Sequence, residues 1–237
     1  MRANLTRYAL WQMRDFARER GIALLLVGTL VGFTIIAPVR ALGREIDAGI
    51  AKTLLTTALA QIAFLLAFIT LNGIVSTDRK QGYYRFLFSK PVSIPAYYAQ
   101  LFVVYLVGFL VAMAILLGAF AIFAHPVSPI APLLYCGMLY LSMGGLAFLI
   151  STLFRHDWSI LAAILLASMV LHELWQYREG WRRLVLSIMP PVYRLSGMLP
   201  DIMNKGTVNT EDVLWLLGYS AICFAAGILI LKRRPFA

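Results

Sequence analysis

Long apolar runs alternate with short polar connections along this chain, and the lengths of the runs indicate how they fold. Six runs are long enough to cross the hydrocarbon core of a bilayer, which takes about 20 apolar residues in a helix. They cover approximately residues 22–39, 53–76, 97–124, 130–154, 158–174 and 213–231. Because backbone polar groups in lipid must be satisfied within their own segment, we expect each run to be a helix. The pattern predicts an all-α membrane protein with six transmembrane helices, of which the fifth is only just long enough to span.

Two further segments have an apolar face and a basic face without the length of a span. Residues 1–20 place apolar side chains on one side of a helix and arginines on the other. This predicts an N-terminal interfacial helix along the cytoplasmic leaflet. Within the long stretch 175–211, residues 177–188 show the same pattern and stop before Pro190, because proline cannot continue a helix. This predicts an interfacial or re-entrant helix on the extracellular side, between spans five and six. Simple membrane anchoring would explain both segments equally well.

Composition and charge agree with a membrane protein and give it an orientation. Hydrophobic residues make up 61% of the chain and charged residues 14%, against about 45–50% and about 25% in soluble domains. Of the 21 Lys and Arg residues, 13 fall on the side of the membrane that holds both termini, which predicts cytoplasmic termini. The net charge of +10 fits this bias and an attraction to anionic membrane lipid, rather than nucleic-acid binding. No soluble domain is evident, so residues 1–237 are predicted to form a single transmembrane domain.

Sequence motifs for chemistry are missing. The chain has no phosphate-binding G-x-x-x-x-G-K-[ST] loop, no H-E-x-x-H metal helix and no G-x-S-x-G nucleophile elbow. Its three histidines lie at span edges on both sides of the membrane, so they cannot converge on one metal ion. We therefore predict no catalytic residue, no metal and no cofactor in this chain. A membrane enzyme is disfavoured, whereas a transporter and a non-transporting scaffold subunit both remain open.

The connection between the second and third spans has a distinctive pattern over residues 78–90. Tyr83, Phe86 and Leu87 recur at i, i+3 and i+4, which predicts a short amphipathic helix. Gly82 allows the chain to turn into this helix, and Pro91 ends it, because the residue before a proline avoids helical angles. A short cytoplasmic helix with apolar and basic side chains is suited to docking into a partner's groove. A membrane-surface helix without a partner would show the same pattern.

This connection resembles the first cytoplasmic loop of type-2 ABC exporter permeases, whose pattern is E-x-G-[ST]-L-x-x-L-L-[ST]-x-P-[VI]-S-R. The matching places are filled here by Gly82, Phe86, Leu87, Ser89, Pro91, Val92 and Ser93. The family also has six spans, an N-terminal interfacial helix and a proline-containing outer stretch that residues 189–197 resemble. The chain departs from the family where residues 79–81 replace the usual glutamate, which leaves Asp78 as the nearest acid.

The resemblance implies a permease subunit of an ATP-binding cassette exporter in the bacterial inner membrane. Such a subunit pairs with a second permease copy or a homologous permease, and docks on a soluble ATPase that binds the ATP and Mg. It would export an amphipathic or lipidic substrate. Coupling to the ATPase would involve Asp78, Arg79, Gly82, Tyr83, Phe86, Leu87 and Pro91. The alternatives are a heme-exporter-type permease and a non-transporting scaffold subunit.

A polar stripe on the second span is the candidate translocation path. Thr53, Thr57 and Gln61 recur every four residues, so they share one face of a helix. Polar side chains within a span tend to face the helix bundle or a cavity. In the resembled family the second and fifth spans flank the central path, which implies that this stripe lines it. Hydrogen bonding between helices is the alternative. On the fourth span, Gly144-Gly145 predicts close approach of another helix.

Overall fold

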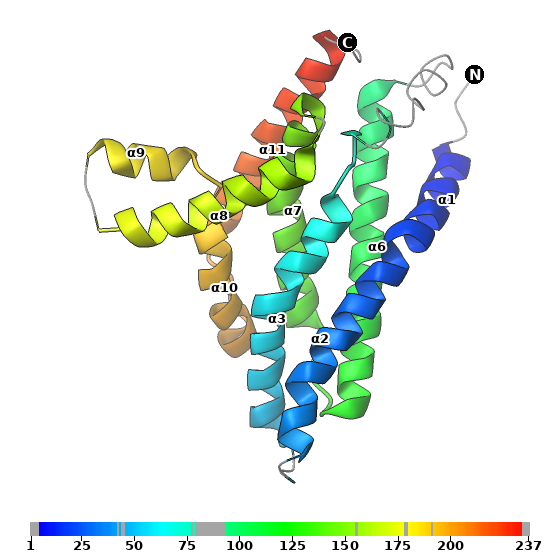
Figure 1. Cartoon of the computed structure of the whole chain (residues 1–237), viewed down its shortest axis with the longest axis vertical. Helices are drawn as coiled ribbons and strands as arrows, with labels where there is room; N and C mark the ends of the chain where they lie inside the picture. The colour runs from blue at the N-terminus through cyan, green and yellow to red at the C-terminus, as the bar shows by residue number, and fades with distance from the viewer. Residues whose placement is uncertain are drawn as a thin grey trace. The chain divides into compact units, whose positions relative to one another are not determined.

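In the computed structural model, all the regular secondary structure of the described residues is helical (Figure 1). It describes residues 5–41, 43, 46–76, 78, 93–154, 156–177, 180–190 and 192–233. Six helices are long and apolar enough to cross a membrane, namely Tyr8–Ala41, Ala48–Leu71, Ile94–Phe123, Ile130–Leu153, Asp157–Trp175 and Thr210–Arg233. The six predicted spans are thereby confirmed as helices, and their length and composition indicate a multi-pass membrane protein.

The helices belong to two compact units. In chain order they are α1 (Leu5–Phe16), a π-helical turn η1 (Ala17–Gly21), α2 (Ile22–Ala41), α3 (Ala48–Leu71), α6 (Ile94–Phe123), α7 (Ile130–Leu153), α8 (Asp157–Trp175), α9 (Trp181–Ile188), α10 (Val192–Lys205) and α11 (Thr210–Arg233). The first unit comprises Met1–Thr70, Ala99–Tyr140 and Leu199–Val208. The second unit comprises Leu71–Tyr98, Leu141–Met198 and Asn209–Ala237. α3 therefore lies almost entirely in the first unit and α8 entirely in the second.

The second span begins and ends five residues earlier than predicted. α3 starts at Ala48 because the Asp47 carboxylate accepts the Ile50 N–H at 2.7 Å, which supplies a helix cap that an apolar pattern does not reveal. It stops at Leu71, and residues 72–75 form a turn in which Gly73 has a φ of 73°. A positive φ is readily adopted by glycine, so the chain leaves the helix here although apolar residues continue.

The N-terminal amphipathic helix exists, but it is continuous with the first span. α1 passes through η1 into α2, and the flanking residues Phe16 and Ile22 both have helical backbone angles. Figure 1 shows the two labelled helices as one uninterrupted ribbon. The π-helical turn adds a residue to one turn and so changes the direction in which the following side chains point. Arg20, within this turn, is buried as a result.

The stretch between α8 and α11 holds two helices where one was predicted. α9 begins at Trp181 rather than at 177, because Gly180 before it has a φ of 80° that a helix cannot contain. No helix was predicted over the range of α10, which contains Pro200. α10 nevertheless has an amphipathic pattern, with buried apolar residues at Val192, Leu195, Met198, Leu199, Ile202 and Met203.

Aromatic side chains and one buried arginine organise the first unit. The Tyr140 hydroxyl donates to the Phe102 carbonyl at 3.0 Å, and the Tyr140 ring stacks on Phe109 with centroids 5.8 Å apart. The Arg20 guanidinium lies 4.6 Å from the Tyr105 ring centroid and donates to the Thr70 carbonyl. Because the last carbonyls of a helix have no partner within it, Arg20 satisfies one end of α3.

Close packing of α7 and α11 organises the second unit. A side chain at Gly145 would overlap the backbone and hydroxyl of Ser220. The Gly145 N–H donates to the Ser220 hydroxyl at 3.1 Å, and that hydroxyl donates to the Leu141 carbonyl. Later in α11, Gly227 leaves room for the Phe148 ring of α7. The centroids of the Phe148 and Phe224 rings are 4.5 Å apart. The close approach predicted at Gly144-Gly145 is confirmed for Gly145.

Replacing Gly145 by alanine should destabilise the protein, whereas the same change at Gly137 in the same helix should not. The new methyl group at Gly145 would meet backbone atoms of α11, and overpacking of this kind costs about 1–3 kcal/mol. At Gly137 the nearest neighbour is a Leu110 methyl 4.0 Å away, so the helix-propensity gain of about 1 kcal/mol should prevail. The melting temperatures of the two detergent-purified variants, measured by thermal unfolding, test both expectations. Equal melting temperatures would contradict this account of α7–α11 packing.

Candidate functional site

The turn that follows α3 is held by side chains from α7 and α8. Ser151 of α7 accepts hydrogen bonds from the N–H groups of Val75 and Ser76, both at 2.9 Å. Asp157 of α8 accepts the Gly73 N–H at 3.2 Å. Ser151, Val75 and Ser76 are each at most 1% exposed. Buried N–H groups need partners, and these two side chains provide them for a turn that has left its helix.

Asp157 has a second role at the start of α8. Its carboxylate also accepts the N–H of Trp158 at 3.1 Å. The residue before it, His156, occupies the N-cap position without a side-chain hydrogen bond. A carboxylate at the first turn is favoured by the positive end of the helix dipole. Asp157 is thus the first residue of α8 rather than its N-cap, and its bond to Gly73 is a contact that the sequence did not reveal.

The first residue of the predicted coupling segment is bonded to α6. The Tyr98 hydroxyl, from the first turns of α6, donates to the Asp78 carboxylate at 3.4 Å. The Tyr98 ring is fully buried and packs edge-on against Phe148, with centroids 5.6 Å apart. Of the predicted coupling residues only Asp78 is described. The others, Arg79, Gly82, Tyr83, Phe86, Leu87 and Pro91, lie outside the described residues.

The predicted polar stripe occupies the exposed face of α3. Thr53, Thr57 and Gln61 are exposed, whereas Leu55 and Leu59 on the opposite side are buried. The Thr53 and Thr57 hydroxyls donate to carbonyls four residues earlier in α3, at 3.0 and 2.9 Å. The hydroxyl protons of these two threonines are therefore used within α3. The structure brings the three side chains onto one face, as the spacing predicted.

An electrostatic cluster joins α10 to α11 in the second unit. Arg194 forms an ion pair with Asp212 and lies 5.3 Å from the Trp215 ring centroid. Partial burial lowers the pKa of Arg194, but hydrogen bonds to Tyr193 and Asp212 outweigh this and raise its pKa above the ordinary value. Arg194 is therefore a permanent cation. The neighbouring Tyr193 ring stacks on the His172 ring of α8, with ring centroids 4.0 Å apart. This cluster therefore holds the start of α10 against α8 and α11.

Within the described residues no group of three His, Cys, Asp or Glu side chains is placed to hold a metal ion. Cys136 and Cys223 are free and buried. No model of a known protein family matches the chain, and no curated protein matches it. The resemblance to type-2 exporter permeases therefore stands on the loop motif and the order of helices.

Replacing Ser151 by alanine should loosen the turn at residues 72–76. The change leaves two buried N–H groups without a partner, at a cost of about 1–3 kcal/mol. We expect faster hydrogen exchange in peptides that cover this turn, measured by mass spectrometry. Ser159→Ala is the matched control, because the Ser159 hydroxyl is exposed and bonds only to the His156 carbonyl. Unchanged exchange in Ser151→Ala would show that the turn does not depend on this hydroxyl.

Proposed function

We propose that this protein is the membrane-spanning permease subunit of an ATP-binding cassette exporter. In this proposal it moves an amphipathic or lipidic substrate out of the cytoplasm of a bacterium, across the inner membrane. Both termini are cytoplasmic, and ATP and Mg bind to a separate soluble ATPase. The observation that carries the proposal is the family-like motif at residues 82–93, which lies between the second and third spanning helices.

The anchoring of this segment supports a coupling role. A loop that transmits movement from a docked ATPase must be attached firmly at both ends, because a loose attachment would absorb the movement. Ser151 and Asp157 hold the turn before the segment, and Asp78 at its start bonds to Tyr98 of α6, the helix that follows it. These bonds lie in the second unit, which also contains α8. Movement of the loop would therefore be passed directly to the ends of α7 and α8.

The polar face of α3 supports a path formed with another permease copy. Gln61 lies near the middle of a 24-residue spanning helix and is exposed in the single chain. A polar face is unfavourable against lipid, so it is expected to face protein or a cavity. A second copy or a homologous permease, paired at this face, would enclose a passage lined by Thr53, Thr57 and Gln61. Its threonine hydroxyls are already satisfied within α3, which suits a passage for cargo with few polar groups.

The coupling proposal is tested by replacing Phe86 and Leu87 together with serine. Central apolar anchors at protein interfaces contribute about 2 kcal/mol or more each, so their loss should detach the ATPase and abolish ATP-driven export. The measurement is co-purification of the tagged permease with the ATPase of the neighbouring gene, followed by lipid- or drug-stimulated ATP hydrolysis in proteoliposomes. The absence of a phosphate-loop ATPase gene nearby would itself count strongly against the proposal.

A matched control changes Leu10 and Trp11 to serine, since these are exposed apolar residues on α1 and are also predicted to be cytoplasmic. This control should keep the ATPase bound. Survival of the complex and of export in the Phe86/Leu87 variant would show that the loop has another role.

The path proposal is tested at Gln61. A lysine placed there puts a charge in the proposed passage, and we expect export to fall about tenfold or more, because a charge at mid-membrane costs about 2.5–3.5 kcal/mol. Gln61→Asn keeps a neutral amide and should retain most of the activity. The folded amount of each variant is first matched by size-exclusion chromatography. Unchanged export with normally coupled ATP hydrolysis in Gln61→Lys would remove this residue from the path.

A further inference from the structure

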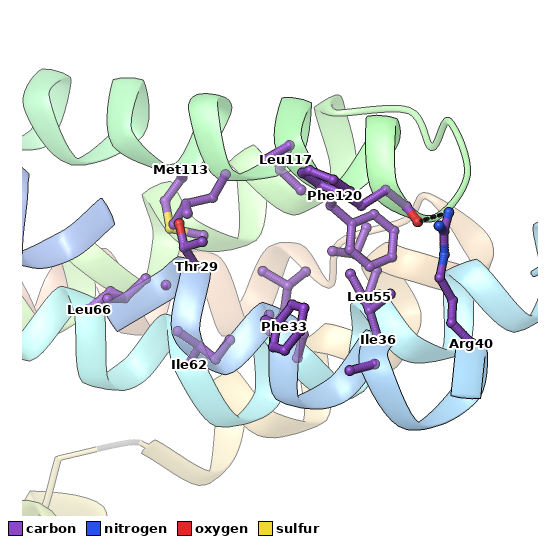
Figure 2. A pocket seen from close by; sticks show the side chains of 18 residues that line it. Thr29, Phe33, Ile36, Arg40, Leu55, Ile62, Leu66, Met113, Leu117 and Phe120 are labelled. Atoms are coloured by element: carbon purple, nitrogen blue, oxygen red, sulfur yellow. Dashed lines mark hydrogen bonds between the residues drawn. The ribbon is translucent and has the colours of Figure 1, made fainter. Parts of the chain in front are cut away.

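A cavity of about 360 Å³ lies between α2, α3 and α6, entirely within the first unit. Its size falls at the lower end of small-molecule binding sites, which span about 300–1,000 Å³. Figure 2 shows the side chains that line it, almost all of them apolar. Among them are Phe33, Leu55, Ile62, Leu66, Met113 and Phe120. A cavity with this lining suits a hydrocarbon chain.

One end of the cavity carries a cation. Arg40, in the last turn of α2, lines the cavity and is exposed. Its guanidinium donates to the carbonyl of Phe123, the last residue of α6 (Figure 2). A guanidinium has five N–H donors, so others remain for a ligand. Among the described residues no carboxylate forms a salt bridge with Arg40. An anionic group at this end would therefore meet the positive charge of the Arg40 guanidinium.

The length of the cavity matches one leaflet of a bilayer. Along α2 the lining runs from Gly28 to Arg40, which at 1.5 Å per residue is about 18 Å. Half of the hydrocarbon core is about 15 Å thick. At the far end α2 and α6 meet, because a side chain at Gly28 would overlap Leu116. The cavity therefore has an apolar end where α2 and α6 meet and a charged end where the spanning helices finish.

The cavity is also open on its outer side. Phe33 lines it and is nevertheless 69% exposed, and a side chain added at Gly32 would meet nothing within 4 Å. Both belong to α2, one of the helices long and apolar enough to span the membrane. In a spanning helix, the medium beside such an opening is lipid. The occupant can therefore enter sideways from the bilayer without crossing water.

We propose that this cavity binds one acyl chain of an anionic glycerophospholipid from the surrounding bilayer, with the headgroup phosphate at Arg40. Burial of the chain between three helices supplies apolar contact, and the guanidinium supplies a charge-assisted hydrogen bond to the phosphate. The bound lipid fills a space that α2, α3 and α6 leave between them. This site is separate from the polar face of α3, so it does not depend on the transport function proposed above.

The first experiment fills the cavity. Purified protein in nanodiscs is exposed to phosphatidylglycerol whose acyl chain carries a terminal diazirine, and labelled residues are mapped by mass spectrometry. Labelling is expected on α2 and α6 residues at the apolar end, including Met113. Gly32→Leu places a side chain in the cavity and should reduce this labelling about tenfold, because several methylenes lose their apolar site.

Gly118→Leu is the matched control for this variant. Gly118 is also a helical glycine of the first unit with nothing within 4 Å of an added side chain, and it does not line the cavity. Its labelling should equal that of the wild type. Both variants are compared only after their melting temperatures are shown to agree with the wild type; if Gly32→Leu fails this check, Gly32→Ala replaces it. Equal labelling in the cavity-filled variant and the control would overturn the proposal.

The second experiment tests the headgroup. The wild type should label more strongly with phosphatidylglycerol than with phosphatidylcholine that carries the same diazirine chain. Arg40→Gln should weaken phosphatidylglycerol labelling about fivefold, since one Arg near the membrane surface contributes about 1 kcal/mol to anionic-lipid binding. Lys52→Gln removes a charge from the first turns of α3, outside the cavity lining, and should have little effect. Equal labelling by both lipids in the wild type would overturn the role of Arg40.

A third measurement asks whether protein, not lipid, covers the opening. A photo-reactive benzoylphenylalanine at position Phe33 should crosslink to phospholipid. Crosslinking to a second copy of the chain instead would overturn the proposal, because the cavity would then be part of a subunit interface.

Discussion

A spanning helix that stops inside an apolar protein leaves backbone groups without partners, and the end of α3 at Leu71 shows how this chain meets that requirement. In the first unit, the Arg20 guanidinium donates to the Thr70 carbonyl. In the second unit, the N–H groups of the turn that follows are accepted by Ser151 and Asp157. Water cannot supply these bonds within hydrocarbon. The side chains that do so therefore determine where the span can end and where the next connection can begin.

This requirement also explains the burial of an arginine near the N-terminus. A cation in an apolar interior is unfavourable unless it is hydrogen-bonded and paired. Arg20 obtains a carbonyl from α3 and the face of Tyr105 from α6. The π-helical turn that contains Arg20 directs it inward while α1 continues into α2. The irregular turn, the buried charge and the end of α3 are thus parts of one arrangement within the first unit.

The sequence predicted what a local pattern can determine. Apolar runs gave the six spans because the hydrocarbon core requires a minimum length, and spacing by four placed Thr53, Thr57 and Gln61 on one face. The sequence pattern could not predict the contacts of Ser151 with Val75 and Ser76, because these residues are 76 and 75 positions away in the chain. Nothing in the local composition distinguishes this serine from others in the spans.

The errors at helix boundaries have local causes that a hydropathy pattern does not register. Gly73 ends α3 within an apolar stretch, and Gly180 delays the start of α9, both through positive φ angles. The Asp47 carboxylate starts α3 early by capping it. α10 was not predicted; it contains Pro200, and its apolar residues form a buried face. The length of an apolar run therefore predicts that a helix exists. Backbone geometry and capping determine where that helix begins and ends.

Polar side chains in this membrane domain divide into two kinds. Ser151, Asp157 and Ser220 complete the hydrogen bonding of the backbone, so each has a structural explanation. Gln61 has no hydrogen-bond partner among the described residues and lies exposed in the middle of a span. Arg40 bonds one carbonyl and has donors left over. We therefore expect contact with a cargo or a partner at Gln61, because an unpaired polar group is unfavourable at membrane depth, and contact with a lipid at the remaining donors of Arg40.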